Sequence, residues 1–152
     1  MLQPKSPAAL PLSPSTDEEV SEYQHTVMAL SEKKLLNLSG KTNTDLKLEY
    51  GVANLTILME YDNNYTTLIN TLTRWGARLF QLEQADDALT VLEYSISIGS
   101  DVSRNFYLLA EYYASLNRPD EIDRLLAKAE DIHSLMKNSI IKKLNEYRQS
   151  CD

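Results

Sequence analysis

The sequence predicts an all-helical protein, and three observations carry that prediction. Apolar residues recur at steps of three and four along most of the chain, which is the period of a helix with one buried face. No segment keeps the strict alternation of apolar and polar residues that a half-buried strand shows. The chain holds four glycines among 152 residues, too few for the tight turns that join neighbouring strands. Short breaks between the helical stretches predict antiparallel helix hairpins, with about seven helices in all.

The composition is that of a folded, acidic protein of one domain's length. Hydrophobic residues make up 43% of the chain and charged residues 24%, so wholesale disorder is disfavoured. The formal net charge is −7, which disfavours nucleic acid as a partner because affinity for phosphates comes from lysine and arginine. The chain has one cysteine, Cys151, so it can form neither an internal disulfide nor a cysteine-based zinc site.

The N-terminal end of the sequence has the composition of a linker. Residues 1–15 hold all but one of the five prolines and show no apolar period. We therefore expect residues 1–15 to form a flexible, proline-rich arm. A docking motif for a proline-binding module is the alternative.

A capping pattern opens the first predicted helix. Thr16 is followed three residues later by Glu19, and a hydroxyl and a carboxylate at this spacing bond to the free amides at a helix start. Apolar residues then step by three and four as far as Leu38. Gly40 predicts the end of this helix, because glycine readily adopts the left-handed conformation that terminates many helices.

A second helical pattern resumes at Asp45 and ends near Tyr61. Its apolar residues are dense enough for burial on more than one side, although Gly51 weakens the prediction of a helix there. Together the two stretches predict a divergent N-terminal helical hairpin over residues 16–62.

Five more helical segments are predicted between Asn63 and Arg148. Pro119 fits the first position of its helix, where a missing amide hydrogen has no cost, and the acids after it favour the positive end of the helix dipole. The predicted breaks lie at residues 82–84, 99–100, 117–118 and 134–136.

The chain repeats its pattern after a shift of 34 residues, which aligns two predicted helix pairs. Gly76 falls on Ala110 at this shift, and small residues at these positions allow two helices to approach closely. Large apolar residues coincide in both copies: Leu72 with Phe106, Trp75 with Leu109, Leu79 with Tyr113, and Leu92 with Leu126.

This pattern resembles the tetratricopeptide repeat. In the second copy the family's large, small, aromatic and alanine positions are held by Phe106, Leu109, Ala110, Tyr113, Leu126 and Ala129. The first copy keeps Gly76, Ala88 and Leu92. It departs from the family where Leu79 replaces the aromatic and Ser95 replaces the second alanine. The resemblance implies that residues 63–152 form two repeats and a C-terminal capping helix, wound into a short right-handed superhelix.

In proteins of this family, the first helix of each pair lines a concave groove that binds an extended peptide or a partner helix. The resemblance therefore implies a protein or peptide partner. Phe80 and Tyr107 are the expected aromatic anchors, and Arg74 and Arg104 are expected to grip a carboxylate or a backbone carbonyl. The expected groove residues are Asn70, Thr73, Arg74, Ala77, Phe80, Gln81, Arg104, Tyr107, Glu111 and Ala114.

Two qualifications follow from the same residues. One subclass of the family clamps a C-terminal carboxylate with lysine and asparagine, but Thr73 and Ala77 occupy those places, so this clamp is not expected. The alternative for Phe80 and Tyr107 is that both rings pack against the divergent N-terminal pair.

No arrangement of residues predicts an enzyme, a metal site or a cofactor. His25 and His133 lie in different predicted helices, without the second ligand at i+4 that a helical metal site uses. The four glycines are isolated, so no phosphate-binding loop is present. Acid pairs such as Asp86-Asp87 fall at predicted helix starts, where the helix dipole accounts for them.

The predicted function is therefore an adaptor or scaffold that binds protein. Self-association into a homo-oligomer, or the soluble part of a membrane-tethered protein, are the alternatives. No stretch approaches the roughly 20 apolar residues of a membrane span, so we do not expect this chain to insert into a membrane. Without a secretory signal the cytoplasm is the expected location, and a membrane anchor upstream of Met1 is the alternative.

Overall fold

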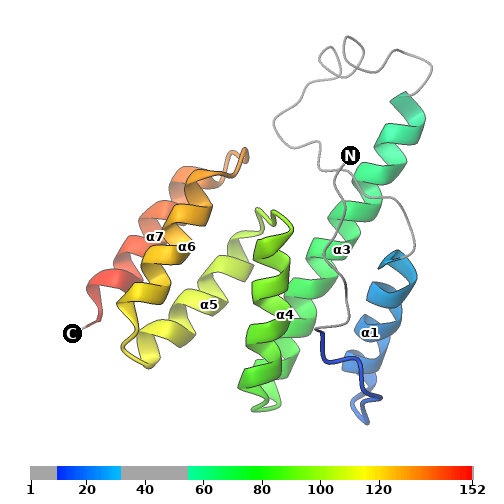
Figure 1. Ribbon diagram of the computed structural model, residues 1–152, viewed down its shortest axis with the longest axis horizontal. Helices are drawn as coiled ribbons and strands as arrows, with labels where there is room; N and C mark the ends of the chain where they lie inside the picture. The colour runs from blue at the N-terminus through cyan, green and yellow to red at the C-terminus, as the bar shows by residue number, and fades with distance from the viewer. Residues whose placement is uncertain (1–9, 32–54, 152) are drawn as a thin grey trace.

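The computed structural model describes residues 10–31 and 55–151, and confirms the all-helical prediction for them (Figure 1). The predicted extension of the first helix to Leu38 and the predicted helix start at Asp45 lie outside these ranges. Within the described ranges there is no strand, and the six helices are α1 (Glu18–Ser31), α3 (Leu55–Gln81), α4 (Ala85–Ser97), α5 (Ser103–Ser115), α6 (Pro119–Glu130) and α7 (Lys137–Gln149).

The helices form a row in which neighbours along the chain run antiparallel, with α1 at one end and α7 at the other (Figure 1). Short connections between helices favour this arrangement, because each helix then buries its apolar face against the one before it. Helix α3 contacts α1, α4 and α5, and α5 contacts α4, α6 and α7. The helices α3 and α5 therefore lie side by side.

The predicted breaks after residue 81 are confirmed at all four places, and local chemistry accounts for them. Gly99 adopts a φ of 95° and Asn117 a φ of 54°, in the left-handed region that these two residue types tolerate best. Glu83 also has a positive φ, of 61°, in the connection between α3 and α4. Pro119 begins α6, as predicted.

The predicted break between Tyr61 and Asn63 is wrong, because α3 runs through it as one helix of 27 residues. Asn63 is exposed, whereas Tyr65 and Leu68 on the next turn are each 2% exposed. The Tyr65 hydroxyl donates a hydrogen bond to the carbonyl of Ile98, at 3.1 Å. Packing of these buried residues outweighs the weak helix propensity of the polar residues before them.

Two apolar clusters form the core. The first joins α1, α3 and α4 through residues such as Val27, Leu72 and Trp75. The second joins α4 to α5, α6 and α7, and includes Leu92 and Phe106. Helix α4 contributes to both clusters, so it is buried on two sides and holds the two halves of the row together.

The close helix approach expected at Gly76 is confirmed. A Cβ atom at this position would lie 2.4 Å from both Cγ and Cδ2 of Leu92 on α4. Leu92 is fully buried, so an added methyl group would have to displace a core side chain. Gly76 is therefore required by the packing of α3 against α4.

The prediction of a flexible arm over residues 1–15 is wrong for residues 10–15, and residues 1–9 lie outside the described part. Leu10 is 5% exposed and belongs to the first apolar cluster. The side-chain amide of Gln24 donates to the carbonyls of Pro11 and Ser13, both at 3.0 Å. One buried leucine and one glutamine thus hold a proline-rich segment against α1 without secondary structure.

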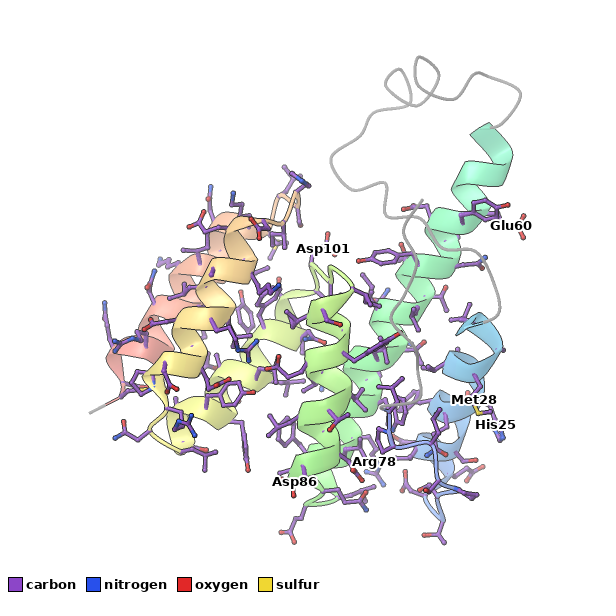
Figure 2. All side chains as sticks on the ribbon, in the orientation of Figure 1. His25, Met28, Glu60, Arg78, Asp86 and Asp101 are labelled. Atoms are coloured by element: carbon purple, nitrogen blue, oxygen red, sulfur yellow. The ribbon has the colours of Figure 1, made fainter. Side chains whose placement is uncertain are left out.

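Asp17, rather than Thr16, caps α1. The amide of Val20 donates to Oδ2 of Asp17 at 3.1 Å, and Thr16 is exposed. Because α1 begins at Glu18, Asp17 occupies the N-cap position, where a carboxylate also interacts favourably with the helix dipole. The same carboxylate pairs with Arg78, which lies near the end of α3. Arg78 is labelled in Figure 2.

Candidate functional site

The candidate site is a groove between α3 and α5, called here the α3–α5 groove. It has a volume of about 410 Å³. Its lining residues are Ala77, Phe80 and Gln81 from α3, and Arg104, Leu108, Glu111, Tyr112 and Ser115 from α5. Five of these eight residues were expected to line the groove from the sequence: Ala77, Phe80, Gln81, Arg104 and Glu111.

Helix periodicity explains which side chains face the groove. On α5, Arg104, Leu108, Glu111 and Ser115 follow one another at steps of four, three and four, so they form one stripe along the helix. The opposite side of α5 carries Phe106, Leu109 and Tyr113, which belong to the second core cluster. The groove stripe is thus the more exposed side of α5, and only its half-buried Leu108 also packs against that cluster.

The floor of the groove is apolar and contains two aromatic rings. Phe80 and Tyr112 lie with ring centroids 5.3 Å apart and planes tilted by 41°. Such tilted pairs are attractive beyond their buried area. Leu108 and Ala77 complete the apolar surface, and the small side chain of Ala77 leaves the hollow open. Each ring is half-buried, so it is held by the core while part of it faces the groove.

A buried polar bridge lies next to the groove and joins α3 to α5. Oγ1 of Thr73 lies 3.2 Å from Oδ1 of Asn105 and 2.9 Å from the carbonyl of Ile69, and its proton serves one of these acceptors at a time. The Asn105 amide donates to the carbonyl of Leu92 on α4, at 3.1 Å. Asn105 is completely buried and Thr73 is 3% exposed. This bridge fixes how α3 and α5 face each other.

The expectation that Thr73 contacts a ligand is therefore wrong, because its hydroxyl is used inside the protein. Asn105 and Tyr112 were not singled out from the sequence. The signal for Asn105 was a polar residue beside Phe106 in an otherwise apolar period, but exposed asparagines share that pattern. The signal for Tyr112 was its place next to Tyr113, which does not say which of the two rings turns outward.

Four other expected groove residues do not line the groove. Tyr107 precedes Leu108 by one position, so it points about 100° around the helix. It packs against the second core cluster, as Ala114 does. Asn70 and Arg74 are exposed on α3, on the turns before Ala77, and lie outside the hollow.

The alternative that both predicted anchor rings pack against the N-terminal helices is wrong for Tyr107, which packs in the second cluster alone. Phe80 contacts both clusters, including the one that contains α1. Its ring therefore supports the core and lines the groove at once.

Two opposite charges flank the apolar floor. Arg104 and Glu111 are both exposed, and neither forms an ion pair with a described residue. They lie seven residues apart on one stripe of α5, which corresponds to about 10.5 Å along the helix axis. The groove thus has a cationic end and an anionic end. This arrangement can bind a side chain by apolar contact and orient it by charge.

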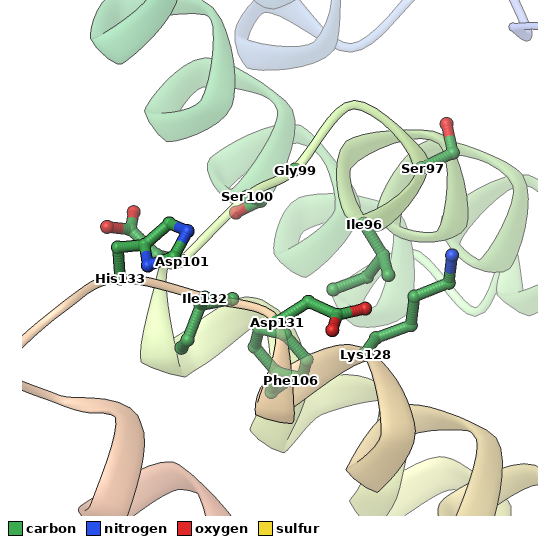
Figure 3. A pocket seen from close by; sticks show the side chains of 10 residues that line it. All are labelled: Ile96, Ser97, Gly99, Ser100, Asp101, Phe106, Lys128, Asp131, Ile132 and His133. Carbon is green, nitrogen blue, oxygen red and sulfur yellow. The ribbon is translucent and has the colours of Figure 1, made fainter. Parts of the chain in front are cut away.

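A second, smaller hollow lies where the connection from α4 to α5 meets the connection from α6 to α7 (Figure 3). Its volume is about 240 Å³, and Figure 3 shows Asp101, Lys128, Asp131 and His133 around it. Within the described residues there is no group of three or more His, Cys, Asp and Glu side chains placed to hold a metal ion. His133 and His25 are both exposed.

Two general findings complete the description of the site. Among the described helices, none combines the length and apolar character needed to cross a membrane. In comparisons of the chain with protein-family models, with curated proteins and with solved structures, no match was found. The function proposed below therefore rests on the residues and geometry of this chain.

Proposed function

We propose that this protein is a tetratricopeptide-like helical-repeat module that binds a peptide segment of a partner protein in the α3–α5 groove. The observation that carries the proposal is an open apolar hollow on two helices that hold equivalent places in the 34-residue sequence repeat. In this reading α3 and α5 are the first helices of their pairs, α4 and α6 are the second helices, and α7 is the capping helix.

The helix contacts support this assignment. In a stack of helix pairs, the first helix of one pair meets its own partner and both helices of the preceding pair. Helix α5 contacts α6, which would be its partner, and also α3 and α4, which would be the preceding pair. Helix α7 repeats the pattern by contacting α5 and α6.

The groove also has the size and chemistry of a binding site. Its volume of about 410 Å³ falls within the range of about 300–1,000 Å³ typical of ligand pockets. Aromatic side chains held by the core are efficient contact residues, because they lose little conformational freedom when a partner binds. Phe80 and Tyr112 meet this description.

A peptide-display selection on the full chain tests the proposal. Recovered peptides would be measured by calorimetry against the wild type and two variants. Leu108→Glu places a charge on the groove floor, and Leu126→Glu places the same charge at a half-buried leucine of α6 outside the groove. We expect Leu108→Glu to weaken binding at least about tenfold, and Leu126→Glu to leave it unchanged.

Circular dichroism on both variants would confirm that each remains helical. Equal binding to the wild type and Leu108→Glu, or a selection that yields no binding peptide, would contradict a peptide site in this groove.

Self-association remains a second prediction from the sequence. Met28 is 50% exposed on α1, whereas the adjacent Leu135 and Met136 are exposed in the connection before α7, at the other end of the row of helices (Figure 1). Light scattering over a range of concentrations tests it, since a strictly monomeric mass would count against a homo-oligomer.

A further inference from the structure

We propose that the α3–α5 groove selects its peptide by charge order as well as by apolar contact. A carboxylate side chain of the peptide pairs with Arg104, a large apolar side chain enters the hollow, and a cationic side chain pairs with Glu111. This inference rests on the proposed function, because it names the chemistry of the segment that the groove would bind.

The first argument is the pairing of arginines across the protein. All six arginines of the chain lie in the described part. Four of them pair with carboxylates: Arg78 with Asp17, Arg118 with Asp120, Arg124 with Glu93 and Glu121, and Arg148 with Asp123. Arg74 and Arg104 form no such pair within the described residues, and both lie on outward stripes at or next to the groove.

The charge balance makes this pattern informative. The chain has 22 acidic and 15 basic residues, so carboxylates outnumber cationic side chains. An arginine at a groove with no carboxylate partner is therefore open to a carboxylate from outside. Its planar guanidinium can accept such a group through two parallel hydrogen bonds.

Glu111 provides the opposite charge. The residues three and four positions away from it on α5 are Tyr107, Leu108, Ala114 and Ser115, and none is a cation. It lines the groove and is exposed, so a lysine or arginine of a bound peptide can reach it. Like charges would repel at either end, so the two charges discriminate against peptides whose two flanking residues carry the same charge.

The spacing of the two charges defines the peptide. Arg104 and Glu111 are separated by about 10.5 Å along α5. An extended peptide advances about 3.3 Å per residue, so it covers this distance in about three residues. The expected segment is extended, with an acidic residue and a basic residue three positions apart and a large apolar residue between them.

Three short peptides with acetylated and amidated ends test the inference on the full chain. The first contains Glu-Phe-Ser-Lys, the second contains Glu-Phe-Ser-Glu with the same charge at both ends, and the third contains Gln-Phe-Ser-Gln. Titration followed by nuclear magnetic resonance would report Kd and the backbone amides that shift. We expect the Glu-Phe-Ser-Lys peptide to bind about threefold to tenfold more tightly than the other two, with shifts at Arg104, Leu108 and Tyr112.

Charge reversal at Arg104 supplies the matched comparison. In Arg104→Glu, we expect the preferred charged peptide to lose its advantage, and a peptide with lysine in place of its glutamate to regain it. Lys142→Glu makes the same change in net charge at an exposed position of α7, and we expect it to leave all affinities unchanged.

The outcomes separate this inference from the proposed function. If all three peptides bind at the groove amides with the same Kd, the charge order is overturned while peptide binding in the groove stands. If none of the three binds, the charge order is overturned, and the display selection with Leu108→Glu decides the proposed function independently.

Discussion

Asp17 and Arg78 lie 61 positions apart in the chain and join through two hydrogen bonds, Nη2 to Oδ1 at 2.8 Å and Nε to Oδ2 at 3.2 Å. Oδ2 of Asp17 also accepts the amide of Val20 and thereby caps α1. Arg78 sits in the last turn of α3, where a cation is favoured by the helix dipole. One carboxylate therefore starts α1 and attaches it to α3.

This pair predicts a pH-dependent contribution to stability. The hydrogen bond from Arg78, together with that from the Val20 amide, lowers the pKa of Asp17 below its usual range. The ionised form is thus favoured in the folded state, so the contribution is present above the ordinary carboxyl pKa of about 4 and is lost as the pH falls through the lowered value. We expect Asp17→Asn to lower Tm at neutral pH, and the difference from the wild type to shrink in acid.

Thr16→Ala is the control for this experiment, because Thr16 is exposed and does not cap the helix. Its Tm should follow that of the wild type at every pH. A Tm difference for Asp17→Asn that stays constant down to strong acid would show that the ionised carboxylate is not what joins the two helices.

Gly76 predicts an unusual cost for a glycine-to-alanine change inside a helix. In an exposed helix this change stabilises by up to about 1 kcal/mol. Here the added methyl group would meet Leu92 at 2.4 Å, so we expect Gly76→Ala to destabilise the protein by about 1–2 kcal/mol in urea unfolding. Adding Leu92→Ala should restore space, so the double variant should lose less than the sum of the two single losses. A gain in stability for Gly76→Ala alone would contradict the close approach of α3 and α4.

We expect the phenol of Tyr113 to titrate late, at a higher pH than an ordinary tyrosine. Its hydroxyl donates a hydrogen bond to Oε1 of Glu93 at 2.8 Å. Oε1 of Glu93 also accepts a hydrogen bond from Nη2 of Arg124 at 2.5 Å. Burial, with added effect from Glu93, raises the pKa of Tyr113 far above its usual value. The neutral phenol is favoured in the folded state, so its stabilising effect is present below the ordinary tyrosine pKa of about 10 and is lost as the pH rises further.

Ultraviolet titration of wild type, Tyr113→Phe and Tyr112→Phe checks this prediction. Tyr113→Phe should remove one late-titrating group and cost about 1 kcal/mol of unfolding free energy at neutral pH. Tyr112→Phe should leave the unfolding free energy unchanged, because the Tyr112 hydroxyl makes no hydrogen bond in the described structure. Burial also raises the pKa of Tyr94, so the Tyr94 phenol should keep its late titration in every variant. Unchanged late titration in Tyr113→Phe would contradict the raised pKa of Tyr113.

The buried hydrogen bonds of Asn105, which lie next to the groove, are expected to stabilise the fold. Asn105→Ala removes the donor to Leu92 and the acceptor near Thr73, and we expect a loss of about 1–3 kcal/mol in urea unfolding. The equivalent change at exposed Asn138 on α7 should have almost no effect. If both variants were equally stable, the bridge would not be what fixes α3 against α5.

Sequence reasoning succeeded where the cause is local. The breaks at Gly99 and Asn117 and the helix start at Pro119 follow from the backbone preferences of those residues, which act over a few positions. It failed at Asp62 and Asn63, where poor helix formers precede the buried Tyr65 and the helix continues. It also failed for Leu10, because a leucine in a proline-rich stretch carries no sign that a distant core will bury it.

The sequence by itself determined that the described chain is helical, where its later helices end, and that Gly76 permits a close contact. Only the tertiary structure decided which outward residues share a groove, because a small rotation of a helix about its axis moves each side chain from one neighbour to another. The rotation that α3 and α5 adopt places Oγ1 of Thr73 3.2 Å from Oδ1 of Asn105. It turns Thr73 inward and leaves Phe80 and Tyr112 facing the same hollow, a relationship that depends on contacts between residues more than thirty positions apart.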